Sequence, residues 1–239
     1  CGGVCGRYAA SADQDQLVEE FEIDQVLAPP QAPSWNIAPT DDVPAVVARL
    51  PGDDGTPVRK LVTLRWGLVP SWAKNSRGGA RLINARFETV AEKPSFRKAF
   101  ANRRCLLPAD GYFEWYAGGA RKQPYFIHRA DGGLLVMAGI YEFWRDPNRP
   151  QGDPQAWVST CSIITTTATE ALGHIHDRMP MIIGQEAWGD WLDPRLTDPH
   201  TALALAQVTD ADHLTAHRVG AAVGNVRNNG PELVQPLGE

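Results

Sequence analysis

Apolar and polar residues alternate over short stretches through most of this chain, a pattern that predicts β-strands. Two such stretches, 43–50 and 61–66, are joined by a segment at 51–57 that contains proline and glycine, which predicts a hairpin-type connection. A longer stretch, 105–116, begins as a strand, turns at Pro108 to Gly111 and resumes as an aromatic strand. The remaining predicted strands are 124–128, 134–144, 156–167, 181–183 and 213–219.

Helix-like patterns in the chain are short and separated. Residues 11–21 combine a serine or aspartate cap with apolar side chains at Leu17, Val18 and Phe21, which predicts a short amphipathic helix. The other predicted helices are 95–103, a short one capped near Thr169, 185–191 and 200–208, and residues 224–239 are predicted to form a polar tail. This mixture favours a single α+β domain on a curved, mostly antiparallel, barrel-like β-sheet with peripheral helices.

Composition narrows the class of protein further. A chain of 239 residues that is 43% apolar is long enough for one large domain with a substantial core. It has no long apolar run and no signal-like segment, so we expect a soluble, cytoplasmic protein. The four cysteines, at positions 1, 5, 105 and 161, show no Cys-x-x-Cys spacing and no disulfide framework. We therefore expect reduced thiols, no metal site and no cofactor.

Positive charge is concentrated in one segment of an acidic chain. The net charge is −5, yet residues 74–104 hold nine basic residues against two acidic ones. The basic residues are Lys74, Arg77, Arg81, Arg86, Lys93, Arg97, Lys98, Arg103 and Arg104. Such segregation is what a groove that follows phosphates needs, although a solvated helix face with its loop would give the same count.

The cysteine at position 5 offers chemistry that no internal cysteine has. If processing leaves Cys5 as the first residue, one residue carries a thiol and a free α-amine, which together convert an aldehyde into an imine and then a thiazolidine. An α-amine titrates near ~7.7–8.0, against ~10.4 for lysine, so it is the better nucleophile at neutral pH. Cys5 follows Cys1-Gly2-Gly3-Val4, however, and only one cysteine can be terminal. We expect residues 1–4 to be absent from the mature protein, either because they form a leader or because Val4 is a bacterial start that is removed. The alternative for Cys5 is an ordinary packed structural cysteine.

Two further candidates lie in predicted strands. Asn84 and Arg86 are two residues apart, so in extended geometry they share one face, where an amide could hold a reacting carbonyl while a guanidinium grips a phosphate. Glu114 lies among Phe113, Trp115 and Tyr116, which would desolvate its carboxyl and raise its pKa. The alternative for Glu114 is the exposed face of the same strand.

A histidine and two tryptophans complete the set of candidates. His176 precedes Arg178 by two residues, and an imidazole can transfer protons at cellular pH; His174 competes for this role. Trp66 and Trp72 bracket a proline turn just before the basic segment, where they could stack on unpaired bases. Burial in the core is the commoner fate of a tryptophan.

The order of these motifs along the chain resembles the SRAP family (SOS response-associated peptidase, or abasic-site processing protein). The resemblance spans about Cys5 to Ile183 and continues more weakly to the C-terminus. It rests on Cys5-Gly6-Arg7-Tyr8, Trp35-Asn36-Ile37-Ala38-Pro39, Trp66-Gly67-Leu68-Val69-Pro70-Ser71-Trp72, Asn84-Ala85-Arg86, Gly111-Tyr112-Phe113-Glu114-Trp115 and His176-Asp177-Arg178-Met179-Pro180.

The resemblance implies a protein that senses abasic sites in single-stranded DNA and forms a covalent cross-link through its terminal cysteine. Cys5 matches the nucleophile, and Asn84 matches the asparagine that orients the cysteine and the opened sugar. Glu114 matches the carboxylate beside the amine, and His176 matches the histidine that donates a proton during ring opening. Three arginines match the residues that bind phosphates, namely Arg7, Arg86 and Arg178. Four further residues match those along the path of the DNA strand, namely Asn36, Pro39, Trp66 and Trp72.

Two other functions fit parts of the same pattern. Cys5 and His176 could serve a cysteine peptidase, for which the four residues before Cys5 would be a natural self-cleavage substrate. The arginines and tryptophans could also form a passive single-strand binding module. For the cross-linking function we expect a monomer that acts on single-stranded DNA, without a membrane and without a cofactor, and that associates with the nucleoid when bound.

Overall fold

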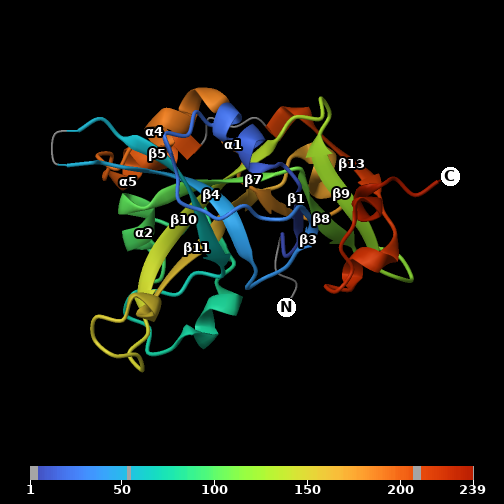
Figure 1. Cartoon of the computed structure of the whole chain (residues 1–239). Helices are drawn as coiled ribbons and strands as arrows, with labels where there is room; N and C mark the ends of the chain where they lie inside the picture. The colour runs from blue at the N-terminus through green and yellow to red at the C-terminus, as the bar shows by residue number, and fades with distance from the viewer. Residues whose placement is uncertain (1–4, 53–54, 207–210, 239) are drawn as a thin grey trace.

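Five strands of the computed structural model, which describes residues 5–52, 55–206 and 211–238, close into a barrel. They are β4 (Asp42–Arg49), β5 (Val58–Trp66), β7 (Arg104–Ala109), β10 (Leu135–Arg145) and β11 (Trp157–Thr167). Neighbours in the order β5-β4-β7-β10-β11 pair antiparallel. A parallel pairing of Cys161 with Trp66 joins β11 back to β5 and closes the ring. The predicted α+β, barrel-like architecture is therefore confirmed (Figure 1).

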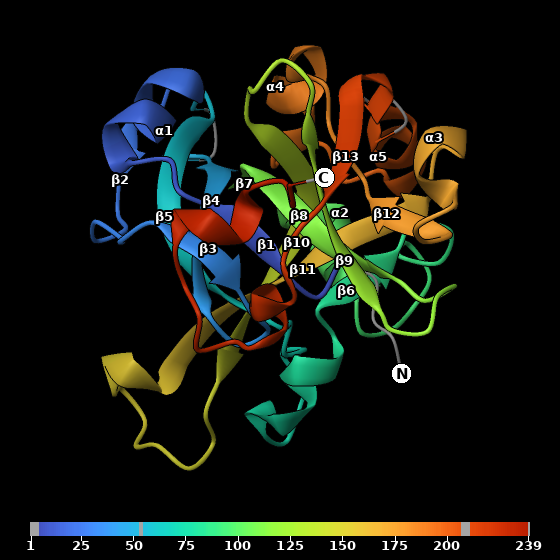
Figure 2. The same cartoon turned by 90° about the vertical axis from the view of Figure 1, so that its right-hand side faces the viewer.

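A second, five-stranded antiparallel sheet lies beside the barrel (Figure 2). Its order is β13 (Leu214–Arg218), β9 (Gln123–Arg129), β8 (Gly111–Tyr116), β1 (Tyr8–Ala10) and β3 (Ser34–Ile37). The chain passes from barrel strand β7 to β8 at Asp110, whose carboxylate accepts a hydrogen bond from the Ser11 N–H at 2.8 Å. The three remaining strands pair with β5 or β11, and they are β2 (Gln25–Val26), β6 (Asn84–Arg86) and β12 (Arg178–Pro180).

Short helices surround these sheets (Figure 1). The α-helices are α1 (Gln14–Glu20), α2 (Arg97–Asn102), α3 (Glu170–Gly173), α4 (Trp188–Leu192) and α5 (Pro199–Ala206). The 3-10 helices are η1 (Ser76–Arg81), η2 (Pro154–Ala156), η3 (Gln185–Ala187), η4 (Ala211–His213), η5 (Ala221–Gly224) and η6 (Pro231–Val234). Asp13 caps α1 by accepting the Gln16 N–H at 2.8 Å, so this predicted cap is confirmed.

The barrel strands are buried on both faces. In β4, Val43, Ala45 and Val47 point into the barrel, where they join Cys5 in one buried cluster. Val46 and Ala48 point outward, against a second cluster that also contains residues of α1, α2, α4 and α5. Cys5 is thus anchored in the apolar interior of the barrel rather than on a surface loop.

Two predicted elements differ from the structure. The strand expected at 181–183 lies earlier, as β12, and beyond Pro180 the chain makes single contacts such as the bridge between Ile182 and Met137. The stretch expected to be a polar tail is packed in part, because Leu233 is buried in a cluster with Phe113. The periodic pattern did not reveal these packing contacts because they join segments distant in sequence.

A buried arginine ties the helices to the barrel. Arg104 is 4% exposed, and burial lowers its pKa to about 10. Its guanidinium donates to carbonyls near the ends of α2 and α4, at Phe100, Ala101, Trp191, Asp193 and Leu196, over 2.8–3.0 Å. This side chain therefore caps two helices that together cover one face of the barrel.

Replacing Arg104 with methionine should destabilise the fold strongly, because several buried carbonyls would lose a charged donor. We expect the free energy of unfolding to fall by about 3 kcal/mol or more, measured by urea denaturation. Arg195→Met is the control, since Arg195 is exposed and pairs only with Asp193, and it should cost about 0.5 kcal/mol or less. Equal losses for the two variants would contradict the capping role.

Candidate active site around Cys5

Cys5 is fully buried, and its backbone nitrogen faces a carboxylate. The Cys5 N–H donates to Glu114 Oε2 at 3.1 Å. The backbone at Cys5 has φ +47°, a left-handed conformation that is uncommon for a residue with a side chain. Burial raises the pKa of the Cys5 thiol well above its ordinary value, and the charge of Glu114 raises it further. In this state the sulfur is a neutral thiol.

Glu114 is a buried carboxyl group on β8, with 5% of the residue exposed. Burial raises its pKa; the Cys5 N–H, and after it the charge of His176, oppose that rise. Its other oxygen, Oε1, accepts the Trp115 N–H at 3.4 Å. The prediction of a desolvated carboxyl with a raised pKa is confirmed, and the exposed alternative is wrong.

His176 lies just before β12, with its ring held by the backbone. Nδ1 accepts the Arg178 N–H at 3.0 Å, and it also lies 3.0 Å from Asp177 Oδ1. These two contacts at Nδ1 fix the orientation of the His176 ring and leave Nε2 for other partners. His174, the competing candidate, is exposed at the C-cap of α3.

Asn84 and Arg86 lie on β6, as the two-residue spacing predicted. This strand runs parallel to β11, with Asn84 opposite Ile163 and Arg86 opposite Thr165. Ile163 belongs to the buried cluster that contains Cys5, which places the Asn84 end of β6 beside the barrel interior. Asn84 is half-buried and Arg86 is exposed, whereas Ala85 between them is buried in the core, so Asn84 and Arg86 share the face of β6 that points away from Ala85.

Arg178, predicted as a phosphate ligand, already holds an anion. Its Nη1 and Nη2 donate to the two carboxylate oxygens of Glu88 at 2.6 and 3.0 Å. This hydrogen bonding holds the pKa of Glu88 below its ordinary value, and Arg86 adds to the effect. Sequence reasoning counted Glu88 only as one acid in a basic segment. Glu88 follows Arg86 by two residues, and this spacing was the one signal in the sequence that Glu88 lies beside the predicted phosphate ligands.

The side chains of Arg7 and Asn36 donate hydrogen bonds to backbone carbonyls of the C-terminal segment. Arg7 Nη1 donates to Asn36 Oδ1 at 3.0 Å and to the Val223 carbonyl at 2.8 Å, and burial lowers the pKa of Arg7. The Asn36 amide donates to the carbonyls of Val223, Asn225 and Asn228 over 2.9–3.3 Å. Asn36 is buried and accepts a hydrogen bond from Arg7, so it positions Arg7, while its place along a DNA path stays a prediction.

The tryptophans and the proline of the predicted strand path have different environments. Trp66 is fully buried, donates its indole N–H to the Ile83 carbonyl at 3.0 Å and packs edge-on against Tyr8. Its predicted role beside bases is therefore corrected to core packing. Trp72 is 66% exposed and is free to stack on a base, and Pro39 is half-buried after β3.

The basic segment separates into structural and solvent-facing cations. Arg104 caps helices as described above, and Arg103 forms an ion pair with Glu142 at 2.7 Å. The other seven are exposed and make no ion pair with any residue that the structure describes; they are Lys74, Arg77, Arg81, Arg86, Lys93, Arg97 and Lys98. These exposed cations are available to contact a polyanionic ligand.

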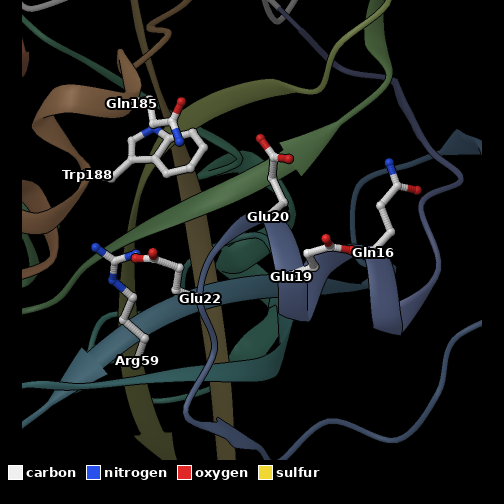
Figure 3. Close-up of a pocket in the computed structure, with 7 residues that line it drawn as sticks. All are labelled: Gln16, Glu19, Glu20, Glu22, Arg59, Gln185 and Trp188. Atoms are coloured by element: carbon white, nitrogen blue, oxygen red, sulfur yellow. The ribbon is translucent and has the colours of Figure 1, made fainter.

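A cavity of about 440 Å³ lies elsewhere, between α1, β5 and the η3–α4 region (Figure 3). Its lining includes Glu19, Glu20 and Trp188 but none of the predicted site residues. The described part of the chain contains no group of three or more His, Cys, Asp or Glu side chains arranged to hold a metal ion. Within the same ranges, no helix is both long and apolar enough to cross a membrane.

The structure defines an α+β barrel protein whose site joins a cysteine nitrogen, a buried carboxyl and a histidine. The chain belongs to the SRAP family, described as SOS response associated peptidase, whose model matches residues 4–226. It is 41% identical to the abasic site processing protein YoqW of Bacillus subtilis (97% of this chain, 99% of that one) and 33% identical to YedK of Escherichia coli (98% and 100%). A solved structure from Bacteroides thetaiotaomicron matches with a TM-score of 0.78 at 26% identity, covering 98% of this chain and all of the other. The family resemblance is confirmed.

Proposed function

We propose that this protein captures the aldehyde of abasic sites in single-stranded DNA by forming a covalent cross-link through Cys5. The observation that carries the proposal is the 3.1 Å contact between the Cys5 nitrogen and buried Glu114, which would place a carboxylate against the α-amine once Cys5 is terminal. The names of its relatives, abasic site processing proteins, support the substrate.

The reaction needs the open-chain aldehyde that an abasic deoxyribose forms when its ring opens. The α-amine of Cys5 adds to the aldehyde carbon, and loss of water gives an imine. The thiol sulfur then adds to the same carbon, and its proton passes to the imine nitrogen, which gives a thiazolidine. Ring closure by the thiol would remove the imine that otherwise permits β-elimination and strand cleavage.

Each site residue has a role that follows from its environment. Glu114 accepts a proton from the amine, while His176 donates a proton to the sugar ring oxygen. Asn84 orients the opened sugar beside Cys5. Arg86 and the exposed cations bind phosphates, and Trp72 stacks on a neighbouring base. An abasic site in a single strand needs no base flipping, so this surface would be sufficient to select it.

Exposure of the amine requires cleavage of the Val4–Cys5 bond by water. Self-cleavage by Cys5 is the second function that we propose, and the peptidase description of the family supports it. Cys5 itself has a left-handed backbone conformation, which is strained for a residue with a side chain. We further propose that the protein acts as a monomer and associates with the nucleoid through DNA.

Intact mass spectrometry before and after incubation with a single-stranded oligonucleotide that carries one abasic site tests the proposal. We expect protein that begins at Cys5 to gain the mass of the oligonucleotide minus one water, and the adduct to withstand heat and detergent. An undamaged oligonucleotide should give no adduct. Absence of an adduct on protein trimmed to Cys5 would remove the aldehyde-capture mechanism and leave the passive binding module.

A further inference from the structure

The anion that Arg178 holds has the geometry of a bound phosphate. Nη1 and Nη2 of Arg178 meet separate carboxylate oxygens of Glu88, at 2.6 and 3.0 Å. This parallel, two-bond arrangement is the one in which a guanidinium recognises carboxylates and phosphates alike. Two acceptors of this kind cannot occupy the same pair of nitrogens at once.

Burial shows from which side a competing anion would come. The Arg178 side chain is 12% exposed, whereas that of Glu88 is 47% exposed. Behind the guanidinium, Nη2 also donates to the backbone carbonyl of Thr165 at 2.8 Å. The arginine is therefore fixed by the protein, and the more exposed carboxylate is the partner that can leave.

We infer that Glu88 is a specificity-determining residue, whose carboxylate occupies the phosphate position on Arg178 and must be displaced by a backbone phosphate of the bound DNA. The inference rests on the proposed function, because it takes DNA as the ligand. The hydrogen bonds from Arg178 lower the pKa of Glu88, so its side chain is a charged carboxylate at the neutral pH at which DNA would bind.

The exchange makes affinity depend on the register of the strand. Breaking the Glu88 pair costs free energy that every DNA ligand must offset before Arg178 becomes available. A strand that is held at the abasic nucleotide keeps one phosphate opposite Arg178 and offsets this cost. An undamaged strand that samples many registers can also bind without engaging Arg178, so Glu88 would lower the affinity for the abasic strand more than the affinity for the undamaged strand.

Removing any negative charge near the DNA could raise affinity, so this general effect must be separated from the displacement of Glu88 by a phosphate. Glu92 provides the matched control. Glu92 lies on the same segment, is exposed and has no ion-pair partner in the described residues. We would measure equilibrium binding of Glu88→Gln and Glu92→Gln to two fluorescent single strands of equal length. One strand carries a tetrahydrofuran abasic analogue, which has no aldehyde, and the other is undamaged.

Glu88→Gln should bind the strand with the abasic analogue about three- to tenfold more tightly than the natural protein, with a smaller gain for the undamaged strand. Glu92→Gln should change both affinities by less than about twofold. The gain should disappear when Glu88→Gln is combined with Arg178→Ala, because the exchanged nitrogen pair is then absent.

Three results would overturn the inference: no gain or a loss of affinity in Glu88→Gln, an equal gain in Glu92→Gln, or a gain that persists without Arg178. Urea denaturation of each variant identifies any loss that reflects unfolding, and Glu88→Ala provides a second variant if Glu88→Gln is unstable. If the natural protein binds single strands but forms no adduct, the cross-linking proposal fails while the exchange is still measured. If it binds no single strand, both fail.

Discussion

Replacing Cys5 with alanine should abolish the stable adduct with abasic DNA, whereas alanine at Cys161 should preserve it. Of these two cysteines, Cys5 alone can offer an amine and a thiol on one residue, because Cys161 lies within β11. Both thiols are fully buried, so the two variants lose the same atom from similar environments. The measurement is the fraction of protein shifted on a denaturing gel and by intact mass after incubation with abasic single strands.

The Cys5→Ala variant also separates the two chemical steps. Once trimmed, it keeps an α-amine at position 5 and can form an imine, which a borohydride reductant would trap as a permanent adduct. Without reductant the imine should reverse or permit strand cleavage. Cys1→Ala should cross-link normally once residues 1–4 are removed. Loss of the adduct in Cys1→Ala and its retention in Cys5→Ala would contradict the assignment of the nucleophile.

The alternation of apolar and polar residues was sufficient to predict most strands of the barrel, but it did not predict which strands pair with each other. Alternation in 43–50 and 61–66 predicted β4 and β5 within a few residues, because each position in these strands faces one of two buried clusters. Closure of the barrel depends on Cys161 meeting Trp66 in a parallel pair. No spacing rule connects these two positions, so only the structure reveals the closed ring.

The site divides in the same way. Glu114 could be predicted because the aromatic residues around it in the sequence indicate a buried strand, and burial raises its pKa. Asn36 could not, since its amide binds carbonyls 187 to 192 residues away. The sequence was compatible with Trp66 either stacking on a base or packing in the core. Its contacts with Tyr8 and the Ile83 carbonyl favour the core. A residue's partners, rather than its type, determine whether it faces a ligand.

Replacing Glu114 with glutamine should slow adduct formation by about 10²–10⁴-fold without destabilising the fold. The amide cannot accept the proton of the Cys5 amine, although it can still accept a hydrogen bond at that position. Glu142→Gln is the matched control, since Glu142 is equally buried but pairs with Arg103 and has no contact with Cys5. It should react at the normal rate and lose about 1–3 kcal/mol of unfolding free energy. Rates are measured in single-turnover reactions at saturating DNA, with urea denaturation in parallel.

The raised pKa of Glu114 gives this comparison a pH dependence of known sign. The folded protein binds a proton at Glu114 at a higher pH than the unfolded chain does, where a glutamate titrates near ~4.3. The natural protein therefore gains stability relative to Glu114→Gln as the pH falls from the raised pKa toward ~4.3, and it has no such gain at pH 8. At pH 8 the variant should be at least as stable as the natural protein while reacting far more slowly. A variant that is both slow and clearly less stable would mean that the carboxyl supports the fold, whereas one that reacts at the normal rate would remove Glu114 from the mechanism.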